Sequence, residues 1–536
     1  MPLFQPSTPI NCSASLIRYP DIPGAAIRLV EAAPVSKGMQ IVPGGGWYPN
    51  NPTVRTSALD FCKVTVTYTI ANSQRNTSVQ VWLPTEGWNQ RIQASGGGWN
   101  AGLHDAGLKA MTGSVIQGYA AIGTNGGYPP DTGPEAWDVL KDGKIDMLNF
   151  QHYATTSLRD LSIVGKSVVK SFYGQPAKYS YWNGCSQGGR QGLTLAQKYP
   201  DAFDGIAASA PVIGWGHLIP AGFWPQAAMN EIGQYPHACE LKTITAAAIK
   251  ACDGNDGIVD GLVSDPDSCK FDPSPLLDTK ADCGTLSNIR ISPAAIKVAQ
   301  TSWAGLRSSV HSYMWTPANH DAALVTEGSV PLISSTLPYF NVTTGLADTQ
   351  CFANGTCTGK PFDIPRDWIR YFIAKDAKYD YTKIGFKEYD DLLAKSVDEY
   401  GPIIGSDSPN MTAFAKAGGK LISYHGTADS IITSRISKRY FDTVLGFDSN
   451  AREYYRLFEA PGVGHCWTAT GLYPSGIFDS LVNWVEKGQV PDVMEVNMTS
   501  VPFARKKTRT LCPYPQKSKY KGSGNEYAAS SFECSI

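Results

Sequence analysis

Long apolar segments and an excess of one charge are both missing from this 536-residue chain. No run of about eighteen apolar residues occurs, so we expect no membrane-spanning helix. Charged residues make up 17% of the chain, and 46 basic residues against 47 acidic ones leave a net charge of −1. Binding to nucleic acid or to an anionic surface needs a basic field. We therefore expect neither a nucleic-acid partner nor a membrane partner.

Several further patterns are absent. No apolar signal-peptide core follows Met1, so we interpret the opening segment as a mature N-terminus. The chain also lacks an HExxH motif and the Cys/His spacing of zinc sites, which argues against metal-dependent hydrolysis. Internal repeats and low-complexity tracts are missing too.

Cysteines and glycosylation sequons point to an oxidising compartment. The chain has 12 cysteines, an even number that suits disulfide formation. Six sequons would each require an exposed asparagine if glycosylated. Together they predict a secreted, extracellular protein; the alternative is a cytosolic enzyme with reduced thiols. The sequon residues are Asn11, Asn76, Asn341, Asn354, Asn410 and Asn497.

Strand-like and helix-like segments alternate up to residue 213 and again from residue 417. This rhythm predicts an α/β fold with a parallel sheet covered by helices on both faces. The predicted strands are 61–68, 78–83, 91–94, 178–183, 203–210, 419–426 and 454–458, and the predicted helices are 148–172, 190–198 and 476–486.

The alternation stops between these two regions. The intervening segment is rich in Pro, Gly, Asp and Cys, and its helical patches at 293–303 and 389–393 are not joined by strand signals. A chain of this length exceeds one simple core. We therefore predict a core domain made of 1–213 and 417–536, with one domain, 214–416, inserted into it.

Ser186 lies in the turn Gly184-Cys185-Ser186-Gln187-Gly188. The G-x-S-x-G pattern alone is common, but here a strand precedes it and a helix follows, as in a nucleophile elbow. The amide of Gln187, at the helix N-terminus, can donate to an oxyanion. We predict that Ser186 is a nucleophile; a glycine-rich turn with an incidental serine is the alternative.

A nucleophilic serine needs a histidine base and a carboxylate that orients it. In the α/β-hydrolase fold the chain order is serine, acid, histidine. Asp429 follows the strand 419–426, and His465 lies in the loop after the next strand, so both fit this order. His425 competes for the role of base, but we expect it to be structural, and His104 is the other histidine placed near the site.

A second oxyanion donor is expected from the turn after an early strand. Gly96-Gly97-Gly98-Trp99 follows the strand 91–94. We select Gly97, to within about one residue. A flexible loop is the alternative.

Cysteines flank two of the proposed catalytic residues. Cys185 precedes Ser186, and Cys466 follows His465. If the serine and the histidine are within hydrogen-bonding reach, their neighbours fall near the Cα separation of roughly 5.5 Å that a disulfide needs. We therefore predict a Cys185–Cys466 disulfide that is essential for activity.

The remaining cysteines are less constrained. Isolation at the two ends of the chain predicts two further disulfides, and the pairing of four cysteines stays open. The predicted pairs are Cys12–Cys62 and Cys512–Cys534, Cys252–Cys269 is a further predicted pair, and the open cysteines are Cys239, Cys283, Cys351 and Cys357.

An aspartate-rich loop lies between Cys252 and Cys269. Carboxylates interleaved with glycines can converge on a hard cation, with backbone carbonyls completing the shell. The spacing is not that of an EF-hand, and an Asp-Gly turn closed by a Cys252–Cys269 disulfide is the alternative. Nothing in the sequence ties this loop to Ser186. The candidate ligands are Asp253, Asp256, Ile258, Asp260 and Leu262.

These motifs resemble the CS-D-HC pattern of the tannase and feruloyl esterase family. The resemblance covers nearly the whole chain and rests on Cys185-Ser186, Asp429 and His465-Cys466. It implies an α/β-hydrolase fold whose insertion, 214–416, is a lid, and it carries the catalytic roles to Ser186, Asp429 and His465. The aspartate-rich loop is similar to the family's calcium site, so the resemblance implies structural calcium in the lid.

The resemblance also narrows the substrate. The family includes enzymes that act on galloyl esters, on hydroxycinnamoyl esters and on a terephthalate monoester. Its fungal tannases are often cut within the lid at a dibasic site, and residues 214–416 contain no Lys-Arg or Arg-Arg pair. We therefore expect a feruloyl esterase that acts on small phenolic esters or feruloylated oligosaccharides.

Two alternatives stay open: a tannase, and a non-catalytic carbohydrate-binding protein. Aromatic residues that could stack on a phenolic ring are present in the insertion, and we assign none of them to the site. They include Trp224, Trp315, Tyr339 and Phe340.

Overall fold

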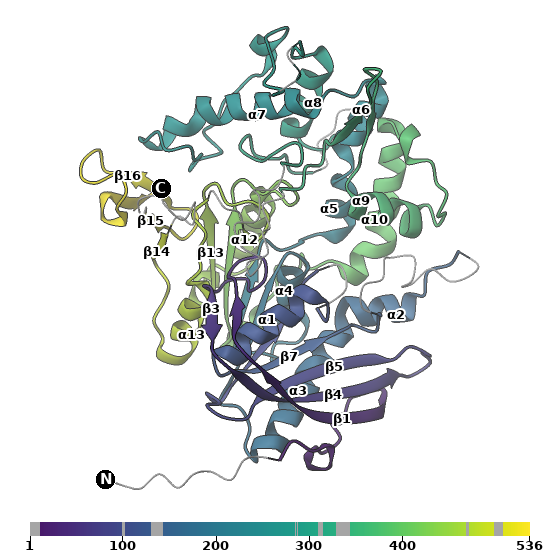
Figure 1. Ribbon diagram of the computed structural model, residues 1–536, viewed down its shortest axis with the longest axis vertical. Coiled ribbons are helices and arrows are strands. Elements are labelled where there is room, and N and C mark those ends of the chain that lie inside the picture. The colour runs from purple at the N-terminus through teal and green to yellow at the C-terminus, as the bar shows by residue number, and fades with distance from the viewer. Residues whose placement is uncertain are drawn as a thin grey trace.

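The computed structural model describes residues 11–98, 102–129, 143–284, 286, 288–308, 315–327, 343–467, 471–497 and 508–536. Its centre is a nine-stranded sheet (Figure 1) in the order β1-β4-β5-β7-β6-β8-β9-β12-β13. The strands are β1 (Ala25–Lys37), β4 (Leu59–Ile70), β5 (Thr77–Pro84), β6 (Arg91–Ser95), β7 (Ala120–Thr124), β8 (Tyr179–Cys185), β9 (Gly205–Ser209), β12 (Lys420–Gly426) and β13 (Tyr455–Ala460).

The sheet is mixed, which corrects the prediction of a parallel sheet. Neighbouring strands are parallel through the part β7-β6-β8-β9-β12-β13 of the sheet. The pairs β1–β4, β4–β5 and β5–β7 are antiparallel, so β7 has one neighbour of each kind. The reason is the connection: the link between β4 and β5, residues 71–76, is a short hairpin loop, and such a loop can join only antiparallel neighbours. Sequence patterns missed β1 and β7.

Helices cover both faces of the sheet. Neighbouring residues of a strand point to opposite faces, and β8 shows this directly. Trp182 belongs to a cluster with Leu193 of α4 (Gln187–Lys198), whereas Tyr181 belongs to a different cluster with Phe478 of α13 (Ile477–Lys487). The other helices of the core are α1 (Asp105–Ile116), α2 (Met147–Gln151), α3 (Ser157–Tyr173) and α12 (Ser434–Phe447). The predicted helix 148–172 is thus α2 and α3, joined by a π turn over His152–Thr156.

The predicted insertion leaves the sheet between two neighbouring strands. Strands β9 and β12 pair directly, although residues 210–419 separate them in sequence. Within the described residues this segment adds no strand to the central sheet, and Figure 1 shows α6, α7 and α8 beyond one end of the strands. Its helices are α5 (Trp215–Ala221), α6 (Trp224–Ile232), α7 (Ala238–Cys252), α8 (Pro293–Ala304), α9 (Asp363–Asp367), α10 (Phe386–Ile404) and α11 (Thr412–Lys416).

Small hairpins complete the described chain. Within the insertion β10 (Thr349–Cys351) pairs with β11 (Cys357–Gly359). Near the ends of the chain the pairs are β2 (Gln40–Val42) with β3 (Val54–Thr56), β14 (Met494–Asn497) with β15 (Thr508–Leu511), and β16 (Lys517–Tyr520) with β17 (Phe532–Ser535).

Two cores hold the insertion together and fasten it to the sheet. One cluster, with Leu241 and Ile244 of α7 and Val298 of α8, belongs to the insertion alone. By contrast, the main core includes residues of α5 and α10 together with the sheet. The insertion is therefore packed onto the sheet domain on one side and self-supporting on the other.

An aromatic cluster forms the joint between the two parts. Phe150 of α2 lies 6.2 Å from the ring of Trp368, 5.7 Å from that of Phe372 and 5.5 Å from that of Tyr400. Trp368 is 1% exposed, and its Nε1 donates to Ser396 Oγ at 2.9 Å. Because large buried aromatics dominate packing energy, this cluster fixes how the insertion sits over the sheet.

All twelve cysteines are paired in the structure. The four predicted disulfides are present, and the open cysteines pair as Cys239–Cys283 and Cys351–Cys357. The sequon residues Asn11, Asn76, Asn354, Asn410 and Asn497 are exposed, whereas Asn341 lies outside the described residues.

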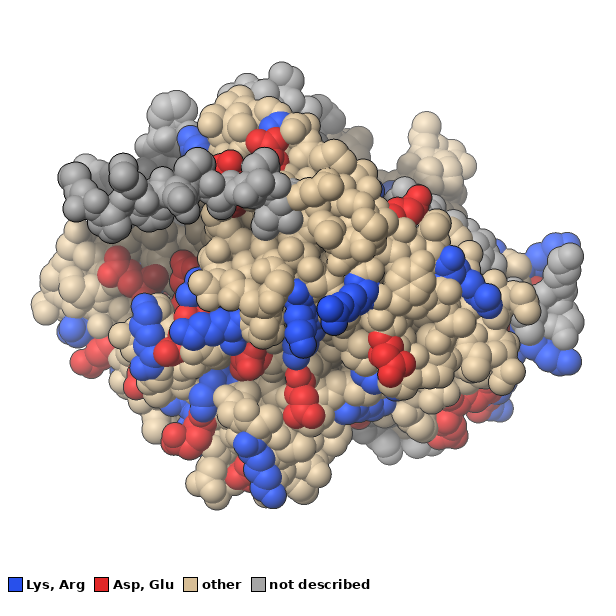
Figure 2. Space-filling view, turned by 90° about the horizontal axis from the view of Figure 1, so that it is seen from below, with Lys and Arg blue, Asp and Glu red and all other residues tan. Residues whose placement is uncertain are grey.

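The surface agrees with the balanced composition. On the face seen in Figure 2, basic and acidic side chains are interspersed. Among the described helices, none has the length and hydropathy needed to cross a membrane.

Replacing Trp368 with alanine should destabilise the protein by about 3–5 kcal/mol, the usual cost of removing a buried aromatic ring. Urea unfolding followed by tryptophan fluorescence would measure the change. Tyr19→Ala, at a residue that is 68% exposed, is the control and should change stability by less than about 0.5 kcal/mol. A cost below about 1 kcal/mol for Trp368→Ala would contradict the role of the cluster as the joint.

Candidate active site

Ser186 occupies a strained turn between β8 and α4. Its backbone has φ 63° and ψ −122°, a region that residues other than glycine rarely adopt. A Cβ on Gly184 would lie 2.6 Å from the carbonyl carbon of Gly188, and a Cβ on Gly188 would lie 2.6 Å from the carbonyl oxygen of Gly96. The glycines are therefore required by close backbone contacts, as the elbow motif predicts.

Hydrogen bonds fix the start of α4 beneath this turn. The amide of Ser186 donates to the Ser209 carbonyl at 3.0 Å. The side chain of Gln187 is held at both ends, since its Nε2 donates to Tyr153 Oη at 2.9 Å and its Oε1 accepts from Arg190 Nε at 2.7 Å. The first amides of a helix have no partner within the helix, so the Gln187 amide is placed as the predicted oxyanion donor.

Asp429 lies in the loop after β12 and is 1% exposed. Its Oδ1 accepts from the amides of Ile431 at 3.0 Å and Ile432 at 2.8 Å, and its Oδ2 accepts from His465 Nδ1 at 2.9 Å. Burial by itself raises the pKa of a carboxyl group. Here the charge and hydrogen bonds of His465 and His425 outweigh burial and hold the pKa of Asp429 well below its usual range.

Two histidines contact Asp429, and the structure separates their roles. His425 Nε2 lies 3.2 Å from Asp429 Oδ2 and 2.8 Å from the Ile432 carbonyl, while its Nδ1 lies 2.7 Å from Ser437 Oγ. Both ring nitrogens of His425 are therefore occupied, and the residue is fully buried. The side chain of His465 is 21% exposed and lines a cavity together with Ser186. With Nδ1 engaged by Asp429, the Nε2 of His465 is the nitrogen left for proton transfer.

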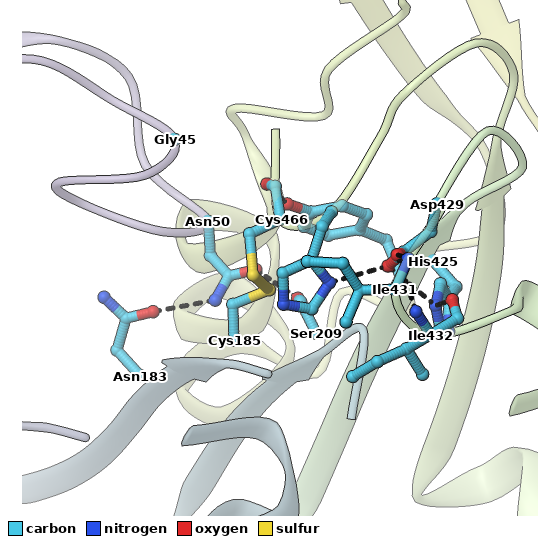
Figure 3. Close-up of a disulfide and its surroundings, with 12 residues drawn as sticks. Gly45, Asn50, Asn183, Cys185, Ser209, His425, Asp429, Ile431, Ile432 and Cys466 are labelled. Carbon is cyan, nitrogen blue, oxygen red and sulfur yellow. Dashed lines mark hydrogen bonds and ion pairs between the residues drawn. A yellow bond between two sulfur atoms is a disulfide. The ribbon is translucent and has the colours of Figure 1, made fainter. Parts of the chain in front are cut away.

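The disulfide between Cys185 and Cys466 joins the nucleophile turn to the histidine loop. The two Cα atoms are 5.9 Å apart, although 281 residues separate them in sequence. Figure 3 shows this bond next to Asp429 and His425. Because each cysteine is bonded to a proposed catalytic residue, the disulfide limits how far Ser186 and His465 can separate.

An N-terminal loop braces the same region, and sequence reasoning missed it. Asn50 is fully buried; its Nδ2 donates to Asn183 Oδ1 at 2.7 Å, and its Oδ1 accepts from Ser209 Oγ (Figure 3). Asn183 and Ser209 belong to the neighbouring strands β8 and β9. A Cβ on Gly46 would lie 2.0 Å from Trp467 Nε1, so the same loop also presses against the histidine loop. Single asparagines carry no motif that would reveal this role.

The predicted oxyanion turn lies beside the nucleophile turn. A Cβ on Gly97 would lie 3.4 Å from the Cys185 carbonyl oxygen and 3.8 Å from the Gly188 amide nitrogen. Gly98, rather than Gly97, lines the cavity with Ser186, and both glycines have positive φ angles. Trp99 lies outside the described residues. The assignment of Gly97 as oxyanion donor stays a prediction, with Gly98 the alternative at one residue's distance.

Ser186 and His465 open into an apolar cavity of about 170 Å³. The insertion lines this cavity with residues of α5 and of the start of α9, and the sheet domain lines it with Ser186, Gln187 and His465, so the two parts share it. The apolar residues around it are Val212, Trp215, Leu218, Ile219, Phe362, Ile364, Pro365, Ile431 and Ile432. Such walls suit an apolar or aromatic portion of a ligand.

The aspartate-rich loop is ordered by its own carboxylates. Asp253 accepts from the amides of Asp260 and Gly261, and Asp260 is paired with Arg509. Burial raises the pKa of Asp256 and of Asp260. Three neighbouring carboxylates, one of which is paired with Arg509, thus form a donor set whose chemistry fits a hard cation.

The carboxylates of this loop do not converge on one point, however. Among the described residues, a single group brings three potential His, Cys or carboxylate ligand atoms within 4.8 Å of one another, namely His237, Cys351 and Cys357. Those two cysteines form a disulfide and cannot act as thiolates. The calcium ligand set Asp253, Asp256, Ile258, Asp260 and Leu262 therefore stays a prediction.

The same loop contacts the histidine loop, which the sequence did not indicate. Leu262 is 4% exposed and packs in one cluster with Val463. A Cβ on Gly462 would lie 2.5 Å from Leu262 Cδ2. The aspartate-rich loop is therefore packed directly against the segment that precedes His465.

Comparisons with known proteins agree with this geometry. The sequence model of the family described as "Tannase and feruloyl esterase" matches residues 62–535. This chain belongs to the tannase and feruloyl esterase family. Members of the family are carboxylic ester hydrolases, and the chain's serine, aspartate and histidine are the residue types that such an activity uses.

Relatives in sequence and in structure carry both names of the family. A probable feruloyl esterase of Arthroderma benhamiae is 37% identical over 98% of this chain and 94% of its own length. Feruloyl esterase B of Aspergillus niger is 28% identical over 89% and 87%. The tannin acyl hydrolase structure from Aspergillus niger superposes with a TM-score of 0.84 at 26% identity, covering 98% of this chain and 95% of that one.

Feruloyl esterase B of Aspergillus oryzae shares the fold. Its crystal structure superposes with a TM-score of 0.73 at 23% identity, covering 96% of this chain and 97% of that one. The mixed α/β architecture is thus common to solved structures of both kinds of enzyme.

Replacing both Cys185 and Cys466 with serine should lower kcat by roughly 100-fold, since a misplacement of about 1 Å between reacting groups has an effect of this size. Hydrolysis of an activated aryl ester would measure kcat, and circular dichroism would check the fold. The Cys351→Ser/Cys357→Ser variant removes a disulfide whose cysteines are six residues apart in a hairpin of the insertion. It should keep nearly full activity. Full activity of the first variant would contradict the role of the disulfide.

Proposed function

We propose that this protein is a secreted feruloyl esterase that releases ferulic and related hydroxycinnamic acids from sugar esters. The observation that carries the proposal is the apolar cavity whose wall includes both Ser186 and His465. The 37% identity to a probable feruloyl esterase over nearly the whole chain supports it. Six disulfides and five exposed sequon residues support secretion.

The reaction begins with attack of Ser186 Oγ on the ester carbonyl carbon. As the O–C bond forms, the hydroxyl proton passes to His465 Nε2, and Asp429 stabilises the imidazolium through Nδ1. Amides of Gln187 and of the Gly97–Gly98 turn hold the oxyanion. The C–O bond to the alcohol then breaks, and the alcohol leaves with the proton from His465.

Water completes the cycle by the same groups. His465 takes a proton from water as the water oxygen attacks the acyl carbon, and it returns the proton to Ser186 Oγ when the acid departs. The strained φ of Ser186 and its disulfide-linked neighbour keep both partners in place through the two steps.

A tannase is the second candidate, and one observation favours it: the TM-score of 0.84 to a tannin acyl hydrolase. The two candidates differ in the acyl group. A galloyl ring carries three hydroxyl groups and is bonded directly to the ester carbonyl carbon, whereas a feruloyl ring is separated from that carbon by a vinyl group. The apolar walls beside Ser186, such as Ile219, Ile431 and Ile432, suit the vinyl group better than ring hydroxyls.

Methyl ferulate should therefore be hydrolysed faster than methyl gallate by the purified protein. Ser186→Ala should lower kcat on methyl ferulate by roughly 10⁴-fold or more, the scale of triad removals. Liquid chromatography of the released acids would measure both rates. His425→Gln is the control, because His425 also contacts Asp429 but does not line the cavity that contains Ser186.

The controls separate the possible outcomes. Labelling by a fluorophosphonate should modify Ser186 in the wild type and leave Ser186→Ala unmodified. A loss below tenfold in Ser186→Ala would overturn the nucleophile assignment. A dominant rate on methyl gallate would make the protein a tannase, and an unlabelled wild type would favour a carbohydrate-binding protein.

We also propose that the loop 252–269 binds calcium. Support comes from the largely buried side chains of Asp253, Asp256 and Asp260, of which Asp260 pairs with Arg509. When bound, calcium would compensate the remaining negative charge of the loop. Through the contact of Leu262 with Gly462, this loop also supports the segment before His465.

Adding calcium to chelator-treated protein should raise Tm by roughly 3 °C or more, because a ligand at about 100 times its Kd adds ~2.7 kcal/mol of stability. Differential scanning calorimetry would measure the shift. Asp256→Asn should abolish it, whereas Asp265→Asn, at a loop carboxylate paired with Lys517, should keep it. An equal calcium response in Asp256→Asn would contradict the ligand assignment.

A further inference from the structure

A second cavity adjoins the one that contains Ser186. Its volume is about 70 Å³. The two cavities share Leu218, Gly222, Leu346 and Ile431 in their walls, so they are neighbouring compartments of one site. Asp429 lies on the wall of the second compartment. A ligand that fills the first compartment can therefore extend into the second.

Within the described residues, three polar atoms of side chains that line the second compartment have no hydrogen-bond partner. They are Trp224 Nε1, Trp315 Nε1 and Thr316 Oγ1, all of which are buried. An unsatisfied buried donor normally costs about 1–3 kcal/mol, which is why such groups are rare in folded proteins. Three of them around one small cavity mark a place where a ligand atom can complete the bonding.

The two indole rings are held firmly by other contacts. Trp224 packs against the rings of Phe386 at 4.6 Å and Tyr389 at 5.3 Å. Trp315 stacks on the ring of His217 at 4.9 Å with an interplanar angle of 4°. Because neither ring is free to turn, their N–H groups are preorganised donors, and preorganisation favours recognition.

The chemistry of these groups defines what they can bind. An indole N–H only donates, so its partner must carry an acceptor oxygen, and the Thr316 hydroxyl can either donate or accept. The rest of the wall is apolar, with residues such as Leu306, Ala318, Ala322 and Leu324. The compartment therefore suits one or two oxygen substituents on an apolar framework, and it is too small for a sugar ring.

We propose that Trp224, Trp315 and Thr316 form a polar subsite for the oxygen substituents of the acyl ring. The phenolic hydroxyl or methoxy oxygen of a hydroxycinnamoyl group lies in the second compartment, while its vinyl group crosses the apolar compartment next to Ser186. This subsite determines which acyl groups are preferred, and it rests on the proposed esterase function. It makes the three residues specificity determinants rather than catalytic residues.

Paired variants and substrates test the subsite. In Trp224→Phe, Trp315→Phe and Thr316→Val one polar group is lost and a side chain of similar character is kept. Each should lower kcat/KM on methyl ferulate by about tenfold, the effect of losing one hydrogen bond to a ligand. For methyl cinnamate, which has no oxygen substituents on its ring, kcat/KM should change by less than about twofold in each variant.

Trp303→Phe is the matched control. Trp303 also has a buried Nε1 without a partner, but the residue is not in the wall of either compartment. It packs against Phe271 and His320 instead. Trp303→Phe should change kcat/KM on methyl ferulate and on methyl cinnamate by the same factor or leave both unchanged. Equal losses on ferulate and cinnamate in the Trp224, Trp315 and Thr316 variants would show a packing role only and would overturn the proposal.

Binding to inactive protein separates the subsite from the esterase function. Calorimetry on the Ser186→Ala protein should show tighter binding of ferulic acid than of cinnamic acid, and adding Trp315→Phe should remove the difference. If the wild type hydrolyses no ester but this difference is found, the function fails and the subsite stands. If the wild type hydrolyses esters but no difference is found in either experiment, the subsite is refuted and the function stands.

Discussion

The covalent bond between Cys185 and Cys466 is the constraint on which the site depends. It closes a loop of 281 residues and joins the turn that carries Ser186 to the loop that carries His465. A large insertion also packs over these two loops. The covalent bond between Cys185 and Cys466 limits the distance between Ser186 and His465.

Packing around the bond makes both loops rigid. The asparagine Asn50 bridges the ends of β8 and β9 beneath the nucleophile turn, and the N-terminal loop that carries it presses on Trp467. On the other side Leu262 packs against Gly462. Segments from the two ends and from the middle of the chain therefore converge on residues next to the catalytic groups, and each limits their motion.

The insertion provides most of the side chains that line the two cavities. The sheet domain contributes the proposed reacting groups, whereas the insertion contributes most of the wall residues, from α5, α6, the segment around Trp315 and the start of α9. Two compartments result: an apolar one next to Ser186 and a smaller one whose wall includes Trp224 and Trp315. This division explains how one family can hold reaction chemistry constant and vary the acyl group, since walls and triad lie on different parts of the chain.

The sequence by itself determined the local features. Short strand and helix patterns located seven of the nine strands, the glycines located the elbow, and chain order selected Asp429 and His465. It missed β1, an exposed edge strand without a clear alternating pattern, and β7, a short run of small residues. Only the tertiary structure decided the mixed direction of the sheet, the contacts at both ring nitrogens of His425, and the place of Asn50. Those features depend on contacts between residues far apart in the chain, and no local pattern records them.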